Sequence, residues 1–188
     1  MAEKIIRCDW CEKDDLYRKY HDEEWGVPVK DDVRHFEFLV LEAMQAGLSW
    51  HTVLRKRENF GKAFDNFDFE IIAKYDEKKL SELLSNDGII RNKAKIIATI
   101  NNAQKFIELR NEFGTFNKYI WKFVDGSPLV NNCELISQIP AKTELSDMVS
   151  RDLKERGFKF VGSTIIYAHL QATGIVNDHI LSCFCRNK

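Results

Sequence analysis

The sequence predicts an all-α protein. Apolar residues recur at helical spacing along most of its 188 residues; Phe36, Leu39, Val40 and Ala43 share one helical face, for example. Nine glycines and only three prolines interrupt these segments. No stretch shows the convincing alternation of apolar and polar residues that predicts a half-buried strand. A chain of this length forms one domain by the usual size range.

Helix ends can be predicted from glycines and capping residues. Glycine often follows a helix because it adopts positive φ without strain, and seven glycines are interpreted as such stops: Gly47, Gly61, Gly88, Gly114, Gly126, Gly157 and Gly174. Side chains that can cap helix N-termini are Asp31 or Asp32, Ser49, Asp76 and Thr143. We therefore expect helices over residues 12–21, 32–46, 49–59, 69–74, 77–86, 91–113, 116–124, 144–156, 161–173 and 177–183.

The least regular stretch runs from Asp125 to Lys142, with two prolines and paired asparagines. It is expected to cross the surface between two lobes of the single domain (1–188). One lobe would combine both termini, about 1–34 and 126–188. The other would be a helical lobe over about 35–125.

Composition limits the class of protein. The 28 basic and 29 acidic residues give a net charge of −1, so a nucleic-acid surface would have to be a local basic patch. No apolar run is long enough to span a membrane, and no signal peptide is evident. Five cysteines, an odd number, suit a reducing compartment better than a disulfide framework. These features predict a soluble cytoplasmic protein that does not contact a membrane.

Residues 157–162, GFKFVG, predict a tight turn between two helices, with glycine at both ends. Its two aromatic residues and Val161 are expected to pack beneath the turn, while Lys154, Arg156 and Lys159 stay outside. Exposed amides at the start of a helix bind one backbone phosphate well.

Three basic clusters could contact further phosphates, although each alone is more often a solvated face. They are Arg55-Lys56-Arg57, Arg91 with Lys93 and Lys95, and the stretch from Arg151 to Lys159.

Cysteines and histidines near both termini predict a metal site. His179 and Cys183 stand four residues apart, on one face of the expected helix 177–183. Together with Cys8 and His21 they make a Cys₂His₂ set, which suits structural Zn²⁺ because four protein ligands leave no open position. Cys11 or Cys185 could replace a histidine, and unpaired buried thiols are the alternative to any metal.

A second group of residues predicts a pocket for a planar base. Three of the four tryptophans lie in the first fifty residues, with two tyrosines between them: Trp10, Tyr17, Tyr20, Trp25 and Trp50. Such rings can stack on a base or simply pack in a core. Glu42 favours the pocket because it lies within the mostly apolar stretch LVLEAMQAGLSW, where an unpaired carboxylate is costly. A salt bridge to a nearby lysine or arginine is the alternative.

Several motifs together resemble the DNA 3-methyladenine glycosylase I family of helix-hairpin-helix glycosylases. They are CDW, LYRKYHDEEWGVP, LEAMQAGLSWHTVLRKRE and GFKFVGSTIIYAHLQATGIVNDHI, in that order, and the resemblance runs from about Cys8 to Cys183. It implies a two-lobed helical fold in which zinc joins the termini. It also implies a monomeric enzyme that flips out and hydrolytically releases 3-methyladenine from alkylated double-stranded DNA, without a lyase step, and leaves activity on 3-methylguanine open.

The resemblance implies a role for individual residues. Zinc would be held by Cys8, His21, His179 and Cys183. The base would be bound by Trp10, Tyr17, Tyr20, Trp25, Glu42 and Trp50, with Glu42 as the catalytic residue. DNA would be contacted by Gln45, Gly47 and Leu48, which enter the duplex, and by the turn residues Lys159, Phe160, Val161 and Gly162. The aspartate common in helix-hairpin-helix glycosylases is replaced by Asn177, which a cationic leaving group tolerates.

Three positions depart from the family pattern: Asp15, His51 and His169 replace a proline, an aliphatic residue and an aromatic residue. They bear on fine substrate preference, not on the class of enzyme.

The sequence leaves two rival functions open. One is a non-catalytic helix-hairpin-helix DNA-binding protein with structural zinc, against which Glu42 argues. The other is a small-molecule hydrolase that uses His179 and Cys183 catalytically, against which four ligands argue.

Overall fold

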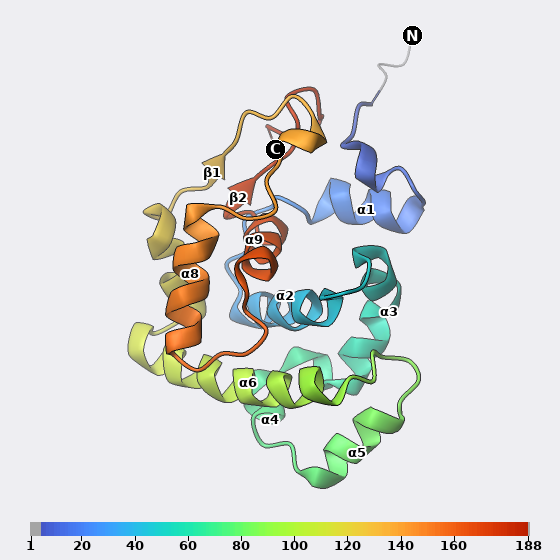
Figure 1. Ribbon diagram of the computed structural model, residues 1–188, viewed down its shortest axis with the longest axis vertical. Coiled ribbons are helices and arrows are strands. Elements are labelled where there is room, and N and C mark those ends of the chain that lie inside the picture. The colour runs from blue at the N-terminus through green and yellow to red at the C-terminus, as the bar shows by residue number, and fades with distance from the viewer. Residues whose placement is uncertain (1–4, 188) are drawn as a thin grey trace.

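The computed structural model describes residues 5–187, and their fold is mostly helical (Figure 1). The α-helices are α1 (Asp15–Glu23), α2 (Asp32–Gln45), α3 (Trp50–Ala63), α4 (Phe69–Ile72), α5 (Glu77–Ser85), α6 (Lys93–Phe113), α7 (Phe116–Trp121), α8 (Glu144–Glu155) and α9 (Ser163–Ala172). Short 3₁₀ turns cover Asp9–Cys11, Asp65–Phe67, Lys122–Val124 and Ile136–Gln138. None of the helices within residues 5–187 has both the length and the apolar character needed to cross a membrane.

Two short strands were not expected from the sequence. β1 (Leu129–Val130) and β2 (Val176–Asn177) pair in parallel, with Leu129 opposite Val176. Leu129 N–H donates to Ile175 O, and Asn131 N–H donates to Asn177 O. Strands of two residues carry no periodicity, and so only the tertiary contact reveals them.

Helix α2 lies at the centre of the fold, and its ten residues from 35 to 44 are all buried. It packs against α3, α6, α7 and α9. Figure 1 shows α2 between α3, α6 and α9. A helix that is apolar on nearly every face must be enclosed in this way. Because α2 has neighbours on all sides, any polar group it carries inward must face a partner or a cavity.

The predicted capping residues are confirmed. Asp31 accepts a hydrogen bond from Arg34 N–H, and Ser49, Asp76 and Thr143 cap α3, α5 and α8 in the same way. Each side chain satisfies a backbone N–H that the first turn leaves unpaired. These local bonds explain why most helix boundaries agree with the sequence to within a few residues.

The predicted helix over 177–183 is wrong. Asn177 belongs to β2, and its Oδ1 accepts a hydrogen bond from His179 N–H at 3.1 Å. Leu181 N–H donates to Cys133 O at 2.9 Å, while Cys183 N–H closes a tight turn onto Ile180 O. Because these backbone donors are bonded elsewhere, they cannot form the i→i−4 bonds of an α-helix.

Two smaller expectations about glycines and aromatics also need correction. Gly61 does not end a helix but lies inside α3, which continues until Asp65, Asn66 and Phe67 adopt positive φ. In the turn after α8, Phe158 and Val161 are buried as predicted, whereas Phe160 has a φ of 54° and remains half-exposed. The left-handed backbone turns the Phe160 side chain away from the core.

Two histidines form an unusual contact inside the core. His35 and His169 are fully buried with ring centroids 5.6 Å apart, and neither nitrogen of His169 has a hydrogen-bond partner among the described residues. Burial lowers the pKa of His35 to about 4 and that of His169 well below its ordinary value. The core therefore holds imidazole rings that stay neutral near neutral pH while the protein is folded.

We expect His169→Phe to raise the free energy of unfolding by about 1–3 kcal/mol at pH 8, because it removes unpaired buried nitrogens. The gain should be larger at pH 5. Below about pH 6.5 the unfolded chain protonates His169 and the folded protein does not, so the wild type loses stability as pH falls. Urea unfolding at both pH values measures this, with His51→Phe as the control at a histidine that has a partner. Equal gains at the two pH values would contradict the role given to His169.

Candidate active site

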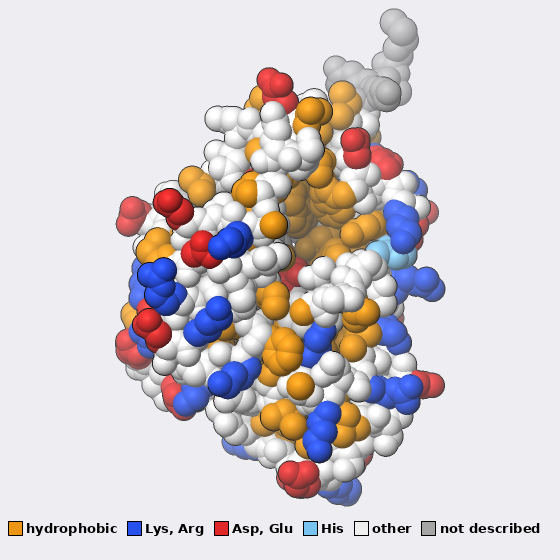
Figure 2. Space-filling model, in the orientation of Figure 1, with side chains coloured by type: hydrophobic (Ala, Val, Ile, Leu, Met, Phe, Trp, Pro, Cys, Tyr) orange, Lys and Arg blue, Asp and Glu red, His pale blue; other side chains and the backbone are white. Residues whose placement is uncertain are grey.

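A cavity of about 290 Å³ opens on the face of the molecule shown in Figure 2, where hydrophobic side chains line a hollow. All six residues of the predicted base pocket line it: Trp10, Tyr17, Tyr20, Trp25, Glu42 and Trp50. They come from the first 3₁₀ turn, α1, the segment after α1, α2 and the start of α3. The tertiary structure thus brings together residues spread over forty positions.

The aromatic rings of this pocket contact one another mostly edge to face. Trp10 lies 5.0 Å from Tyr17 and 5.1 Å from Trp25 between ring centroids, with interplanar angles of 67° and 77°. Tyr20 lies 5.3 Å from Trp50. This geometry is favourable between rings and leaves ring faces available for a flat ligand.

Glu42 is the acidic residue of the pocket and is 4% exposed. No side chain or backbone group of the described chain makes a hydrogen bond or an ion pair with its carboxyl, so the salt-bridge alternative does not hold. Burial raises its pKa from the ordinary 4.5 to about 8. The pKa values of Tyr17 and Tyr20 are also raised, first by burial and then by the Glu42 charge. A cation entering the pocket would find a partner in Glu42.

Four further residues line the cavity that sequence reasoning did not identify: Ile136, Ile139, Ala168 and Gln171. The two isoleucines belong to the stretch expected only to cross the surface. Ala168 and Gln171 lie three apart on α9 and therefore on one face of that helix. The local sequence carries no signal for these roles, because ordinary aliphatic residues and a helical glutamine fit many positions.

The predicted wedge loop, Gln45 to Leu48, follows the C-terminus of α2 at the pocket rim. Gly47 has a φ of 79° with open space around its Cα, and Leu48 is 40% exposed. Gln45 Nε2 donates to Leu48 O at 3.1 Å. The loop therefore presents an apolar side chain to solvent on a hydrogen-bonded turn.

Lys95 forms hydrogen bonds to the backbone at the start of the same loop. Its Nζ donates to Met44 O at 2.9 Å and to Ala46 O at 2.6 Å, and the side chain is 6% exposed. Burial lowers its pKa. A cation on the last carbonyls of a helix is favourable because it satisfies acceptors that the helix leaves unpaired. The expectation that Lys95 contacts phosphate is therefore wrong.

The turn from Gly157 to Gly162 is fixed by side chains of α6 and α8. Asn102 bonds Lys159 twice at 2.8 Å, accepting from its N–H and donating to its carbonyl. Asn101 donates to Gly157 O, and Ser150 donates to Val161 O. Because these carbonyls accept hydrogen bonds from side chains, the turn is held in one conformation. Lys159 and the N-terminus of α9 remain accessible to solvent.

The remaining basic clusters are partly used for internal bonds. Arg57 pairs with Glu24 and Glu37, and Lys56 donates to Asp87 O and Gly88 O. Arg156 pairs with Glu112 and Asp152. The basic side chains of the three clusters that stay exposed are Arg55, Arg91, Lys93, Arg151, Lys154 and Lys159.

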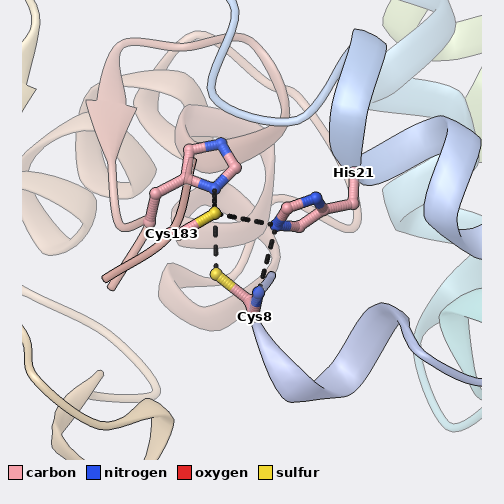
Figure 3. Close-up of side chains that lie close together, drawn as sticks. Cys8, His21 and Cys183 are labelled. Atoms are coloured by element: carbon pink, nitrogen blue, oxygen red, sulfur yellow. Dashed lines mark hydrogen bonds between the residues drawn. The ribbon is translucent and has the colours of Figure 1, made fainter. Parts of the chain in front are cut away.

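The four predicted metal ligands lie together and are all buried, with their ligand atoms within 4.8 Å of one another. Figure 3 shows Cys8, His21 and Cys183 pointing toward one another from opposite ends of the chain. The sulfur of Cys183 lies 3.4 Å from His179 Nδ1 and 3.5 Å from His21 Nε2. The cluster could hold a metal ion.

Neighbouring groups orient the two histidines of this cluster. His21 Nδ1 lies 2.8 Å from Asp22 Oδ1, and Arg7 donates to the same carboxylate. His179 Nε2 donates to Trp25 O at 3.0 Å. Such bonds to the second ring nitrogen are typical of histidine ligands. Of the alternative thiols, Cys11 lies outside both possible ligand groups, and Cys185 falls in a separate group with His21 and Asp22.

Asp178, beside the cluster, is fully occupied. Its Oδ1 accepts from Asn131 Nδ2 at 2.7 Å, and its Oδ2 accepts from Tyr167 OH and Gln171 Nε2 at 2.5 and 2.7 Å. The side chain is 1% exposed. These contacts make Asp178 a structural carboxylate rather than one that activates water.

His51, one of the departures from the family pattern, joins two walls of the pocket. Its Nε2 lies 2.5 Å from Asp14 Oδ2, and Asp14 also caps α1 by accepting from Tyr17 N–H. Its ring contacts Tyr17. The pair connects α3 to α1 at the pocket rim.

The chain is similar to known proteins along nearly its whole length. The model of the methyladenine glycosylase family matches residues 10–186. DNA-3-methyladenine glycosylase 1 of Escherichia coli is 46% identical over 179 residues, 95% of this chain and 96% of that protein. A crystal structure of 3-methyladenine DNA glycosylase I is 48% identical with a TM-score of 0.93, over 96% of this chain and 100% of that one.

A second solved structure concerns 3-methyladenine recognition by the Staphylococcus aureus 3-methyladenine DNA glycosylase I. It is 33% identical with a TM-score of 0.93 and covers 97% of each chain. The shared fold and the relatives at this level of identity define an N-glycosyl hydrolase of the DNA glycosylase class. The chain belongs to the methyladenine glycosylase family.

The raised pKa of Glu42 has a measurable effect on stability. Between about pH 4.5 and 8 the folded protein keeps a proton that the unfolded chain releases, so rising pH lowers the free energy of unfolding across this window. Glu42→Gln removes this dependence. We expect it to stabilise the protein on the order of 2–4 kcal/mol at pH 9 and little at pH 5. Urea unfolding at both pH values tests this.

Glu37→Gln is the matched control, because that carboxylate pairs with Arg57 and its loss should destabilise the protein. If Glu42→Gln has the same effect at pH 5 and pH 9, the carboxyl titrates alike in both states and the argument is wrong.

Proposed function

We propose that this chain extrudes 3-methyladenine from alkylated double-stranded DNA and hydrolyses its glycosidic bond, without a lyase step. The observation that carries the proposal is Glu42, an unpartnered carboxyl inside an aromatic cavity that can take a planar base. Membership of the methyladenine glycosylase family and the relatives named for this activity support the substrate.

Selection depends on charge. Methylation at N3 makes the adenine of DNA a cation, whereas unmodified adenine is neutral. Ring faces of Trp10, Trp25 and Trp50 attract a cation, and the Glu42 carboxyl becomes favourable to ionise once the cation enters. A neutral base would meet the protonated carboxyl and form no ion pair, and ionising Glu42 beside it would be costly. The pocket therefore favours the lesion over the far commoner normal base.

The chemistry needs little help from the enzyme. When the bond between the sugar and base N9 breaks, its electron pair moves onto the base and neutralises the positive charge. Water then adds to the sugar carbon and loses a proton to solvent. Because the leaving group needs no protonation, no general acid is required. The main tasks of the enzyme are to select the cationic base and to hold the nucleotide in a dry pocket while positive charge moves to the sugar. Asp178, whose oxygens accept three hydrogen bonds, is assigned no role as a base.

DNA would be held at two places. The turn from Lys159 to Gly162 and the exposed N-terminus of α9 would bind a backbone phosphate, which makes α8, the turn and α9 the proposed helix-hairpin-helix. The loop with Gln45, Gly47 and Leu48 would enter the duplex, where Leu48 fills the space that the extruded base leaves.

We also propose that the four-residue cluster holds structural Zn²⁺. In a tetrahedral zinc site the distance between a sulfur and a nitrogen ligand is roughly 3.6 Å, from the usual zinc–ligand lengths. The corresponding distances here are 3.4–3.7 Å. Four protein ligands would make the metal a clip between the termini of one two-lobed domain, with the second lobe over about 35–125, and would exclude a catalytic role.

Two further proposals concern the protein's surroundings. A monomer is proposed because one copy of the chain supplies every residue of the pocket. The cytoplasm is proposed because no disulfide joins the five cysteines, all of which lie in the described chain. The rival of a non-catalytic DNA-binding protein does not account for an unpaired carboxyl among aromatic rings.

Methylated duplex DNA should release 3-methyladenine and not 7-methylguanine when treated with the protein, as measured by chromatography of the free bases. Glu42→Gln should slow release about 100-fold at limiting DNA concentration, because it removes the charge that selects the cationic base and that opposes the positive charge developing on the sugar. Glu58→Gln, an exposed carboxylate of α3, is the matched control and should act as the wild type. Unchanged release by Glu42→Gln would keep the enzyme and reject this pocket; no release by a folded wild type would favour the DNA-binding rival.

Removal of one cluster ligand should release the metal. Cys183→Ala is expected to purify with less than one zinc per chain and to lose several kcal/mol of stability, since binding to a site absent from the unfolded chain adds to folding. Cys11→Ala, also buried but outside the cluster, should keep one zinc. Elemental analysis and thermal unfolding, with and without a chelator, measure both. Full zinc content in Cys183→Ala would show that Cys183 is not a ligand.

A further inference from the structure

Gln171 is a pocket residue whose side chain is held from behind. It lies on α9 beside Ala168 and is half-buried at the cavity wall. Its Nε2 donates to Asp178 Oδ2 at 2.7 Å, and its backbone carbonyl accepts from Gly26 N–H at 3.0 Å. The residue therefore joins the base pocket to a buried carboxylate on its far side.

The bond to Asp178 determines which end of the amide faces the pocket. Asp178 is 1% exposed and accepts from Tyr167 and Asn131 as well as from Gln171. A carboxylate can only accept, so the amide nitrogen of Gln171 must face Asp178 and its oxygen must point the other way. No donor among residues 5–187 reaches Gln171 Oε1. The cavity wall thus carries a hydrogen-bond acceptor of fixed orientation that no described residue occupies, and a bound ligand can donate to it.

We propose that Gln171 Oε1 accepts a hydrogen bond from the exocyclic 6-amino group of the bound base, and so selects amino-purines over oxo-purines. The inference rests on the proposed function and deepens it. Adenine derivatives carry an amine at C6, which has two hydrogens and can satisfy two acceptors, Glu42 and Gln171. Guanine derivatives carry an oxygen at C6. This oxygen would face Gln171 Oε1, and because both atoms are acceptors, no hydrogen bond could form between them.

The two acceptors have different tasks. Glu42 responds to the charge of the base, and both 3-methyladenine and 3-methylguanine in DNA are cations. Charge alone therefore cannot separate them. A fixed neutral acceptor reads only hydrogen-bond polarity, and a site built to pair with an amine strongly rejects an analogue that lacks it. Asp178 acts as a positioning residue because it prevents the amide from turning over.

The test compares the affinities of free 3-methyladenine and 3-methylguanine, measured by quenching of tryptophan fluorescence. Gln171→Met keeps the length of the side chain and removes the acceptor. It should weaken 3-methyladenine binding about tenfold, the equivalent of one hydrogen bond, and leave 3-methylguanine binding unchanged or improved. Gln104→Met, at an exposed glutamine of α6 outside the pocket, is the matched control. Equal weakening of both bases, or of neither, would overturn the proposal.

A second variant tests the orientation and leaves every pocket atom in place. Asp178→Asn introduces an amide that can donate as well as accept, so Gln171 is free to turn its nitrogen toward the cavity. The ratio of the two affinities should fall toward one while Gln171 is still present. A purely structural role for Asp178 would change thermal stability and leave the ratio unaltered. If this variant does not fold, the outcome is decided by Gln171→Met.

Failure of this inference can be told apart from failure of the proposed function. Wild-type protein that binds neither base and releases none from methylated duplex DNA would reject the function itself. Wild-type protein that releases 3-methyladenine, combined with an unchanged affinity ratio in Gln171→Met, would reject the role of Gln171 alone.

Discussion

The fold depends on the enclosure of α2. Helices on all sides exclude water from its ten central residues, and one of those residues is an acid. Within residues 5–187 the Glu42 carboxyl faces the aromatic cavity and has no hydrogen-bond or ion-pair partner. In the proposed function, a bound cationic base offsets the free-energy cost of burying this carboxyl. The packing that buries Glu42 in the core is therefore also what would make the pocket favour a cationic base.

The metal cluster and the pocket share one stretch of chain. Trp10 follows Cys8 by two residues, Tyr20 precedes His21, and the carbonyl of Trp25 accepts the hydrogen bond from His179. Any movement of these ligands would move three walls of the pocket. A zinc ion far from the reacting atoms would thus still determine how the base is held.

Helix α6 connects the two surfaces proposed to contact DNA, because its side chains form hydrogen bonds to both. Lys95 at its start bonds the carbonyls that end α2, while Asn101 and Asn102, two turns further on, bond the turn after α8. A continuous helix is rigid over this distance, so the apolar Leu48 and the amides near Gly162 keep a constant separation. The proposed extrusion of the lesion would use this constant spacing, because the phosphate contact would hold the duplex while the loop enters it.

The sequence by itself determined most of the helices and their caps, because helical periodicity and capping are local signals. Its resemblance to a known family, and not composition alone, singled out the four possible metal ligands and the aromatic residues that line the cavity with Glu42. Only the tertiary structure decided how His179 and Cys183 reach the cluster, through a strand and a tight turn instead of a helix. The tertiary structure also shows that Lys95 is buried and bonds backbone carbonyls, and that Ile136 and Gln171 line the pocket. Such roles depend on contacts between residues far apart in the chain, and no local pattern records them.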